Sequence, residues 1–283
     1  MIIKKESKMI IKTEGEVTYL ESSLLNSLEW LNHGISTRKG GVSEDFCSSM
    51  NLAKGKPFDT DENVMENYRR FSNAVGINPD KIVSMGQVHE DNIVVVDKNH
   101  KCLGISTEFD FNNTDGMVTN VSGISLFGYT ADCPLVMIAD DKNHVVGICH
   151  SGWRGTVKEI STKLIEKMKI AFGSNTDNMY AFIAPSICQD CFEVSEDVIL
   201  EINKIIEEDK RGTVYYKKEN GKYQLNLWET IKICLMEAGI KAENIELPHI
   251  CSKCNTDYFF SHRQLGEKRG TGAAFIMIKN DGM

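Results

Sequence analysis

The sequence predicts an α/β (α+β) domain in which short strands form mixed, largely antiparallel sheets and amphipathic helices cover their outer faces. Two observations indicate this class. Apolar, β-branched runs recur with hairpin-length connections, and several longer segments carry apolar residues at helical spacing. Strands and helices do not alternate regularly, so a wholly parallel sheet is not expected. The 283 residues contain no repeat or Pro/Ser-rich linker, and we expect one domain over 1–283, with peripheral strands in about 1–25.

The first half of the chain is expected to hold short strands and one helix. Strands are predicted at 9–12, 16–20, 82–85, 93–96 and 124–127, and residues 32–43 predict a strand that runs into a glycine loop. A helix is predicted at 60–75. Thr60 can cap its N-terminus, acidic residues fill its first turn, and Gly76 can end it.

The second half carries most of the predicted helices. Apolar residues at helical spacing predict a helix at 156–172, which Gly173 can end. Helices are also predicted at 197–207 and 227–238, and strands at 135–139, 145–149, 245–250 and 273–278.

A predicted hairpin is the most informative local feature. If Asp141-Lys142 is its two-residue loop, Cys133 and His150 each lie eight residues from the loop and face each other across the ladder. Directly opposed residues on antiparallel strands have Cβ atoms roughly 4.5–5.5 Å apart. This distance suits two ligands of one metal ion, or a thiol beside its general base.

The segment Gly152-Trp-Arg-Gly155 follows this pair directly. Its glycines allow close approach of a ligand, and its arginine can bind an anion. A catalytic zinc site needs three protein ligands and one open position, for which cysteine and histidine are typical. His89 is the candidate third ligand. Taken singly, His89 could be a surface histidine, Cys133 a buried filler and His150 a strand-end residue.

Composition limits the possible partners and compartment. The formal net charge of −8 argues against nucleic acid and anionic membranes as partners. The first residues lack the apolar core of a secretory signal, and no apolar run is long enough to cross a membrane. We therefore expect a cytoplasmic protein whose nine cysteines stay reduced.

Several sequence blocks, in order from about residue 30 to the C-terminus, resemble the YfiH/YlmD family. These blocks are His33-Gly-Ile-Ser-Thr-Arg-Lys-Gly-Gly-Val-Ser43, Asn51-Leu52, Gln87-Val-His89, Asp132-Cys-Pro134, His150-Ser-Gly-Trp-Arg-Gly155, Ile183-Ala-Pro-Ser186 and Phe259-Phe-Ser-His-Arg263. The resemblance implies a four-layer α-β-β-α sandwich. It also implies a zinc-dependent purine nucleoside phosphorylase with adenosine deaminase side activity, in a family earlier described as laccase-like polyphenol oxidoreductases.

The resemblance also assigns site residues. It implies a zinc ion on His89, Cys133 and His150, and substrates that are a purine nucleoside (adenosine, inosine, guanosine or methylthioadenosine) and inorganic phosphate. Cys133 is then expected to be catalytic as well as a ligand. Asp132 is a further catalytic candidate, with two alternatives, orienting a zinc ligand or capping a strand. The predicted substrate-binding residues are Arg38, Asn51 and Arg154.

Other interpretations remain open at this stage. A copper-dependent polyphenol oxidase could use the same cysteine and histidines, although seven histidines are few for a multicopper cluster. A metal-free deamidase or hydrolase would use Cys133 as nucleophile and His150 as base. A non-enzymatic binding module would not require the clustered glycines. The sequence leaves the oligomeric state open between monomer and homodimer.

Two CxxC pairs lie outside the family blocks. Cys188-Gln-Asp-Cys191 and Cys251-Ser-Lys-Cys254 could form a second metal site. The 59 residues between the pairs far exceed the usual spacing of roughly 15–20 residues. The alternative is a set of reduced, partly buried thiols. The His-x-Glu signature of nucleobase deaminases is absent, so any deaminase activity would come from an unrelated site.

Overall fold

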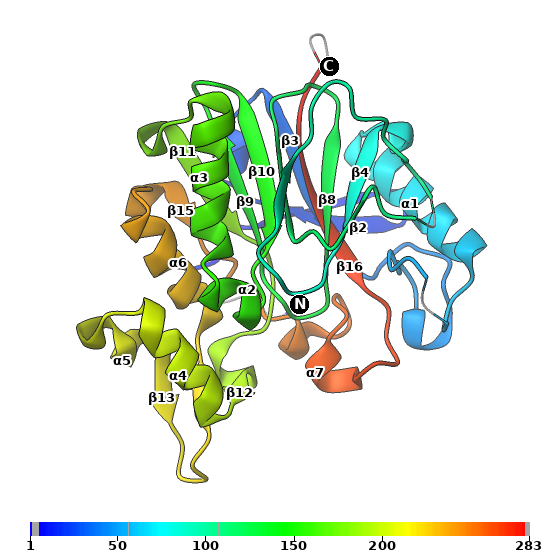
Figure 1. The fold of residues 1–283 in the computed structure, drawn as a ribbon. Coiled ribbons are helices and arrows are strands. Elements are labelled where there is room, and N and C mark those ends of the chain that lie inside the picture. Colours follow the sequence, from blue (N-terminus) through cyan, green and yellow to red (C-terminus); the bar gives the residue numbers. More distant parts are fainter. Residues whose placement is uncertain (2–5, 56, 107, 281–283) are drawn as a thin grey trace.

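Two large mixed sheets form the centre of the molecule, with helices on either side (Figure 1). The computed structural model describes residues 1, 6–55, 57–106 and 108–280. Its strands are β1 (Ile10–Glu14), β2 (Val17–Glu21), β3 (Leu31–Ser36), β4 (Ile82–Gly86), β5 (Ile93–Val95), β6 (Phe111–Asn112), β7 (Gly116–Thr119), β8 (Ser125–Thr130), β9 (Leu135–Asp140), β10 (Val145–His150), β11 (Met179–Ile183), β12 (Glu193–Val194), β13 (Tyr215–Lys217), β14 (Tyr223–Leu225), β15 (Ile245–Glu246) and β16 (Gly272–Ile278). Its α-helices are α1 (Asp61–Val75), α2 (Trp153–Val157), α3 (Ile160–Phe172), α4 (Glu196–Ile205), α5 (Arg211–Val214), α6 (Leu227–Glu237) and α7 (His262–Leu265).

Both large sheets are mixed and mostly antiparallel. The first has the order β1-β2-β3-β16-β8-β4-β6, in which only the pairs that involve β4 are parallel. The second has the order β15-β11-β9-β10-β7-β5, with parallel pairs only at its two edges. A small antiparallel sheet, β12-β14-β13, carries the loop that reaches furthest from the centre. The predicted mixed, largely antiparallel α/β class is confirmed.

Alternating side chains divide the interior into three apolar cores. On β9, Met137 faces the core between the two sheets, whereas Ile138 faces the helices α3, α4 and α6. On β8, Leu126 faces the inter-sheet core, whereas Phe127 packs against Phe71 of α1. These three cores are consistent with the four-layer order, which stays a prediction. At the amino terminus β1 is exposed, whereas β2 is largely buried between two of the cores.

Helix α1 begins and ends as the sequence predicts. The side chain of Thr60 accepts a hydrogen bond from the amide of Asn63, 3.2 Å away. Gly76 adopts a left-handed conformation with φ of 69°, which ends the helix. Among the described residues, no helix combines the length and apolarity needed to cross a membrane.

The register predicted for the β9–β10 hairpin is wrong by two residues. Asp140 pairs with Val145 and Leu135 pairs with His150, so the loop is 141–144 rather than Asp141-Lys142. Cys133 therefore lies before β9 instead of opposite His150 on the ladder.

The side chain of Asp140 explains the longer loop. Its Oδ1 accepts hydrogen bonds from the amides of Lys142 (3.0 Å) and Asn143 (3.3 Å), which stabilises the turn within the four-residue loop 141–144. Because the shift is an even number of residues, every side chain keeps its predicted face. The two segments stay hydrogen-bonded in the same register beyond the strands, since Ser151 N donates to Pro134 O at 2.9 Å. Cys133 thus remains beside the end of β10.

Two other predicted elements are interrupted. The helix predicted at 156–172 is two helices, α2 and α3, because Glu159 adopts a left-handed conformation with φ of 58°. The strand predicted at 245–250 ends after Glu246. Pro248 offers no N–H for a ladder, and His249 has φ of 50°.

Candidate metal centre and substrate cavities

His89, Cys133 and His150 meet at one end of the second sheet. One ligand atom from each lies within 4.8 Å of the others, and the two imidazole rings contact edge to face at 4.8 Å between centroids. His150 is the last residue of β10, Cys133 lies in the loop before β9, and His89 lies in the loop after β4. The structure therefore brings together the three residues predicted as metal ligands. Their role as ligands stays a prediction.

Asp115 holds this arrangement in place. Its Oδ1 accepts a hydrogen bond from His150 Nδ1 at 2.9 Å, which leaves Nε2 of His150 to face the other two residues. The same buried carboxylate accepts hydrogen bonds from the backbone amides of Val88, His89 and Glu90, at 3.0–3.1 Å. One side chain thus fixes the ring of one candidate ligand and the backbone of another.

The backbone around the three residues is specialised. His89 and Asp132, which precedes Cys133, have φ values of 64° and 95°, a region that non-glycine residues rarely occupy. A Cβ atom on Gly152 would lie 3.0 Å from Cys133 Sγ and 3.5 Å from His150 Nε2. The glycine therefore leaves space around the atoms that would hold an ion.

Charge interactions favour an ionised thiol at Cys133. Burial by itself raises the pKa of this thiol, but hydrogen bonds from His150 and His89 outweigh burial and lower the pKa well below its usual value. Burial by itself lowers the pKa of His150, but its contacts with Asp115 and Cys133 outweigh burial and raise the pKa. A thiolate beside two imidazoles is a suitable donor set for zinc.

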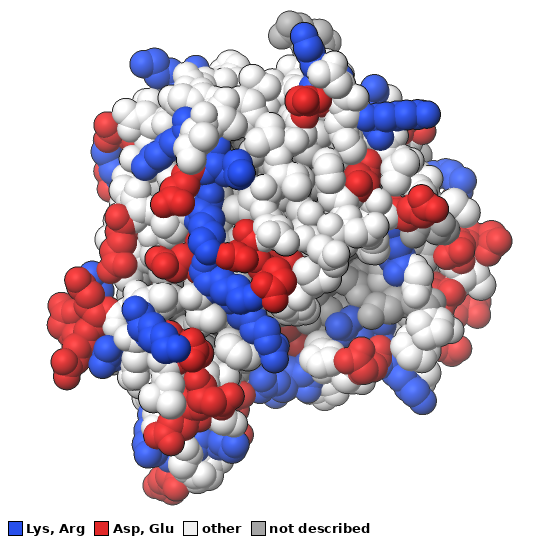
Figure 2. Space-filling view, in the orientation of Figure 1, with Lys and Arg blue, Asp and Glu red and all other residues white. Residues whose placement is uncertain are grey.

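The loop that carries His89 is also tied to the outer helices. Glu90 forms an ion pair with Lys158, and Asp91 forms one with Lys163 of α3. Figure 2 shows lysine and arginine side chains in a band over this face, with carboxylates directly against it. Exposed ion pairs add little stability. We therefore regard these two pairs as contacts that position the loop of His89.

Two cavities meet at the metal candidates. The larger, of about 460 Å³, is lined by apolar side chains that include Trp153, Ile187, Phe192 and Leu227, and by three arginines. The smaller, of about 380 Å³, is lined by Phe109, Tyr129, Gln87 and Lys54 among others. His89, Cys133 and Arg269 line both cavities. Two reactants could therefore approach the three residues from different sides.

Lys54, which is buried, and Arg269, which is half-buried, are cations that line these cavities. Arg269 Nη1 donates to Thr271 Oγ1 at 3.1 Å, but its buried Nε has no partner among the described residues. Lys54 Nζ donates to Ser84 Oγ at 2.9 Å and to Glu108 O at 2.7 Å. Burial lowers the pKa of Lys54 to about 8, against the attraction of Asp110. Both side chains would gain from a bound anion.

Asp132 lines the larger cavity, but its carboxylate is engaged by the C-terminal segment. Oδ1 accepts a hydrogen bond from Ser252 Oγ at 2.6 Å. Oδ2 accepts hydrogen bonds from Ser261 Oγ at 3.0 Å and from the amide of Arg263 at 2.7 Å. This geometry favours positioning of the neighbouring Cys133 among the three predicted roles of Asp132.

The three predicted substrate-binding residues lie in different places. Arg154 lines the larger cavity, and its guanidinium lies 4.4 Å from the ring centroid of Trp153. Arg38 lines neither of the two cavities, and it donates to the carbonyls of Ser48 and Thr256.

Asn51 is fully buried and also lines neither cavity. Its Oδ1 accepts hydrogen bonds from the amides of Ala53 (3.1 Å) and Thr271 (2.9 Å), which flank the smaller cavity. Asn51 therefore shapes a cavity wall.

Sequence reasoning missed Asp115, Lys54 and Arg269. Each is a single charged residue outside a recognisable motif, and each gains its role only through contacts with distant segments. The one local signal was at Asp115, a lone carboxylate directly before the apolar run of β7.

Comparison with known proteins gives consistent results. Residues 32–279 match the family model described as multi-copper polyphenol oxidoreductase laccase. A purine nucleoside phosphorylase of Bacteroides thetaiotaomicron is 31% identical over 257 residues, which cover 90% of this chain and 94% of that protein. Adenosine deaminase RL5, from an unknown prokaryotic organism, is 34% identical over 69% of this chain and 74% of its own length. Purine nucleoside phosphorylase YlmD of Bacillus subtilis is 29% identical over 87% of this chain and 88% of its own length.

Solved structures agree with this result. The crystal structure of the Bacillus licheniformis hypothetical protein YfiH superposes with a TM-score of 0.87 at 27% identity, covering 95% of this chain and 99% of that chain. YlmD of Geobacillus stearothermophilus has the same fold, with a TM-score of 0.88. The predicted YfiH/YlmD resemblance is confirmed, and the chain belongs to the multi-copper polyphenol oxidoreductase laccase family.

Proposed function

We propose that the chain is a zinc-dependent purine nucleoside phosphorylase that also deaminates adenosine. The observation that carries the proposal is the position of His89, Cys133 and His150 between two cavities that share a half-buried arginine, Arg269. The names of the relatives at 31% and 34% identity support both activities. Phosphorolysis joins two reactants at one carbon atom, so it needs two binding regions that meet.

The three residues fit a zinc ion. Two imidazoles and one thiolate provide the three protein ligands of a catalytic site, and Asp115 selects the Nε2 atom of His150 as the donor. When bound, zinc supplies a Lewis acid that polarises a substrate atom and can lower the pKa of a water molecule.

Phosphate fits the smaller cavity. Lys54 and Arg269 are its two cationic side chains, and the unpaired Nε of Arg269 offers a donor to an anion. In phosphorolysis a phosphate oxygen bonds to the anomeric carbon while the glycosidic C–N bond breaks and its electron pair stays with the purine. The two cations would hold the phosphate in place and compensate its negative charge as it approaches the nucleoside.

The nucleoside fits the larger cavity. Trp153, Phe192 and Leu227 offer apolar surface to a purine ring, and Arg154 stands at the same wall. A nucleoside placed here would direct its ribose towards Arg269 and Cys133, which line both cavities. In the deamination, water oxygen would replace the exocyclic amine of adenine and ammonia would leave.

Replacement of Cys133 by alanine tests the proposal. With inosine and phosphate, hypoxanthine release should fall by more than the ~10–100-fold that loss of an outer metal partner costs. Cys102→Ala, at a half-buried thiol outside both cavities, is the matched control and should keep its activity. Undiminished release by the Cys133 variant would exclude the mechanism.

One observation favours a second candidate, a metal-free Cys/His hydrolase or deamidase. Cys133, His150 and Asp115 form a thiol–imidazole–carboxylate sequence with the polarity of a catalytic triad. The nearby His89 favours metal binding over this alternative. Alkylation of Cys133 in metal-replete protein discriminates, because a coordinated thiolate should react slowly whereas a free catalytic thiolate should react fast.

A copper ion at the same three residues is the remaining alternative. A multicopper cluster would need several further imidazoles, but among the described residues only one other histidine, His262 of α7, lines the larger cavity. The rest lie elsewhere: His33 in β3, His100 beside Asp110, His144 against Trp30 and His249 near Trp228. Metal analysis of protein prepared without added copper should find zinc.

A further inference from the structure

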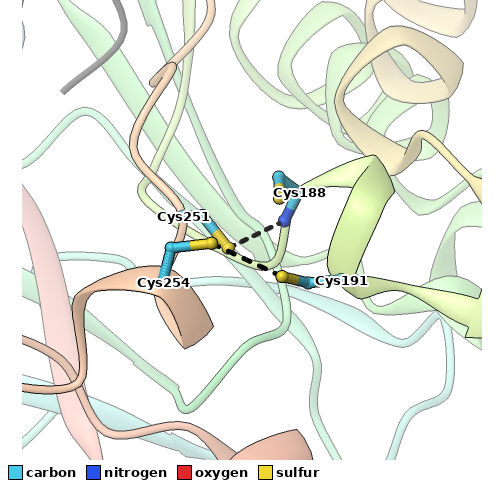
Figure 3. A group of neighbouring side chains, drawn as sticks. All are labelled: Cys188, Cys191, Cys251 and Cys254. Carbon is cyan, nitrogen blue, oxygen red and sulfur yellow. Dashed lines mark hydrogen bonds between the residues drawn. The ribbon is translucent and has the colours of Figure 1, made fainter. Parts of the chain in front are cut away.

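Four cysteines from the two CxxC pairs form a second cluster, separate from the one at the cavities. The sulfur atoms of Cys188, Cys191, Cys251 and Cys254 all lie within 4.8 Å of one another. Figure 3 shows the two pairs approaching from different segments, one at the short 3₁₀ helix Gln189–Cys191 and the other at the 3₁₀ helix Lys253–Asn255. The wide gap in sequence is therefore closed by the fold.

The spacing of the sulfurs suits a single tetrahedral ion. Four thiolates at a Zn–S distance of ~2.3 Å lie about 3.8 Å from one another. The sulfurs of Cys191 and Cys254 are 3.4 Å apart, and no pair exceeds 4.8 Å. Small side-chain movements would therefore complete the coordination. A cluster of several irons would need its four sulfurs further apart.

Local contacts favour the ionised sulfurs that a metal requires. The backbone amide of Cys188 points at Cys251 Sγ, with a distance of 3.3 Å, and such a donor stabilises a thiolate.

Burial is graded across the cluster. Cys188 and Cys251 are buried, Cys191 is half-buried and Cys254 is exposed. The exposed side gives an ion a path of entry, while the buried side protects the complex from solvent.

We propose that Cys188, Cys191, Cys251 and Cys254 bind one structural zinc ion. Four protein ligands leave no open position, so this ion would not take part in chemistry. It would join two segments that are 63 positions apart in the chain.

These two segments lead directly to the loop of Cys133. Ser252, inside the second CxxC pair, donates its hydroxyl to Asp132 Oδ1 at 2.6 Å. Ile187, next to the first pair, donates its amide to Asp132 O at 2.9 Å. Both backbone segments also bond to each other, since Ser252 N donates to Ser186 O at 3.1 Å. The ion would thus clamp the two contacts that position the residue before Cys133.

The same segments form a wall of the larger cavity. Ile187 and Phe192 flank the first CxxC pair and line that cavity. Arg263, also in its lining, donates from Nη1 to the carbonyl of Glu193 at 3.0 Å. Loss of the ion should therefore loosen the nucleoside region, in addition to lowering stability.

The test uses full-length protein with Cys133→Ser, which removes the thiolate of the other candidate site. The purified protein should retain about one zinc ion per chain, as expected for a closed four-thiolate site. After replacement of zinc by cobalt it should show an intense near-ultraviolet band of thiolate-to-cobalt charge transfer, together with visible bands of a tetrahedral ion. With Cys133 absent, that band must come from the four cysteines.

The further change Cys191→Ser/Cys254→Ser removes the two least buried ligands and should abolish both signals. Cys102→Ser in the same background is the matched control and should keep them. If the double variant does not fold, the Cys133→Ser protein decides alone. Absence of tightly bound zinc and of the cobalt band in that protein, or an intact mass showing a disulfide among the four cysteines, would overturn the proposal. Equal zinc in wild type and Cys133→Ser would instead count against the site at the cavities.

Discussion

Asp115→Asn is the sharpest perturbation of the candidate metal centre. Oδ1 of Asp115 accepts from His150 Nδ1 (2.9 Å) and from the amide of His89 (3.1 Å). Oδ2 accepts from the amides of Val88 and Glu90, both at 3.0 Å. Asparagine has nearly the same shape but carries hydrogen-bond donors in place of one of these oxygens. In either orientation, two donors then face another donor; His150 Nδ1 is buried, whereas the three backbone amides are partly buried.

The magnitude follows from these contacts. A buried donor left without a partner costs ~1–3 kcal/mol and a partly buried one costs less, so the variant should lose no more than about 6 kcal/mol of stability. If the amide nitrogen faces His150, the ring must accept at Nδ1, and its proton moves to Nε2, the atom that faces Cys133. Loss of such an orienting partner typically weakens metal binding by about 10–100-fold.

Zinc affinity should be measured by competition with a chromogenic chelator, and stability by urea unfolding of the metal-free protein. Asp110→Asn is the matched control. This carboxylate is also fully buried and accepts from His100 Nε2 (3.0 Å) and from the amides of Ser84 and Leu103. The control should lose stability but keep the zinc affinity of the cavity site. Wild-type zinc affinity in Asp115→Asn would refute the reasoning.

Three further predictions concern the cavities and the sheet. Gly152→Ala places a methyl group 3.0 Å from Cys133 Sγ, so zinc should bind at least ~10-fold more weakly in the same competition assay. Unchanged binding would show that zinc does not need the space that Gly152 leaves beside Cys133. Arg269→Gln removes a charge-assisted contact worth ~1.5–3 kcal/mol. The KM for phosphate should therefore rise about 10–100-fold, with less change in the KM for inosine. An unchanged KM for phosphate would place the anion elsewhere. Burial lowers the pKa of His33 to about 4, whereas its pKa in the unfolded chain is ~6.5. Between these two pH values the unfolded state binds more protons than the folded state. The free energy of unfolding should therefore fall by about 3 kcal/mol as the pH drops from 6.5 to 4. Urea unfolding of His33→Gln, whose side chain can still accept from Ser22, should lack this component of the fall; an identical pH dependence would contradict it.

The sequence predicted the helix caps and most strand positions because those signals are local. Thr60 and Gly76 determine the ends of α1 through their own side-chain or backbone chemistry. The hairpin register was predicted from the common two-residue turn. It depends instead on hydrogen bonds from two loop amides to the side chain of Asp140, which the turn preference does not include. Strands β7 and β11 were not predicted, because short apolar runs such as 179–183 gain strand geometry only from their neighbours in the sheet.

The candidate site was predictable where a motif marks it. His89, Cys133 and His150 lie in distinctive sequence blocks, and the fold brings them together. The residues that surround them were not predictable in the same way. Asp115 becomes important only because the fold places its carboxylate beside His150. Arg269 lies 136 positions beyond Cys133, in the segment between α7 and β16, and reaches the cavities only in the folded chain.

Anomalous scattering from crystals, recorded on both sides of the zinc absorption edge, tests the metal centre most directly. We expect a zinc peak within ~2.0–2.3 Å of Nε2 of His150, Sγ of Cys133 and a ring nitrogen of His89, next to the two cavities. Absence of a peak there, or a copper signal in its place, would contradict the zinc-dependent mechanism. So would an ion that leaves His89 out of bonding distance.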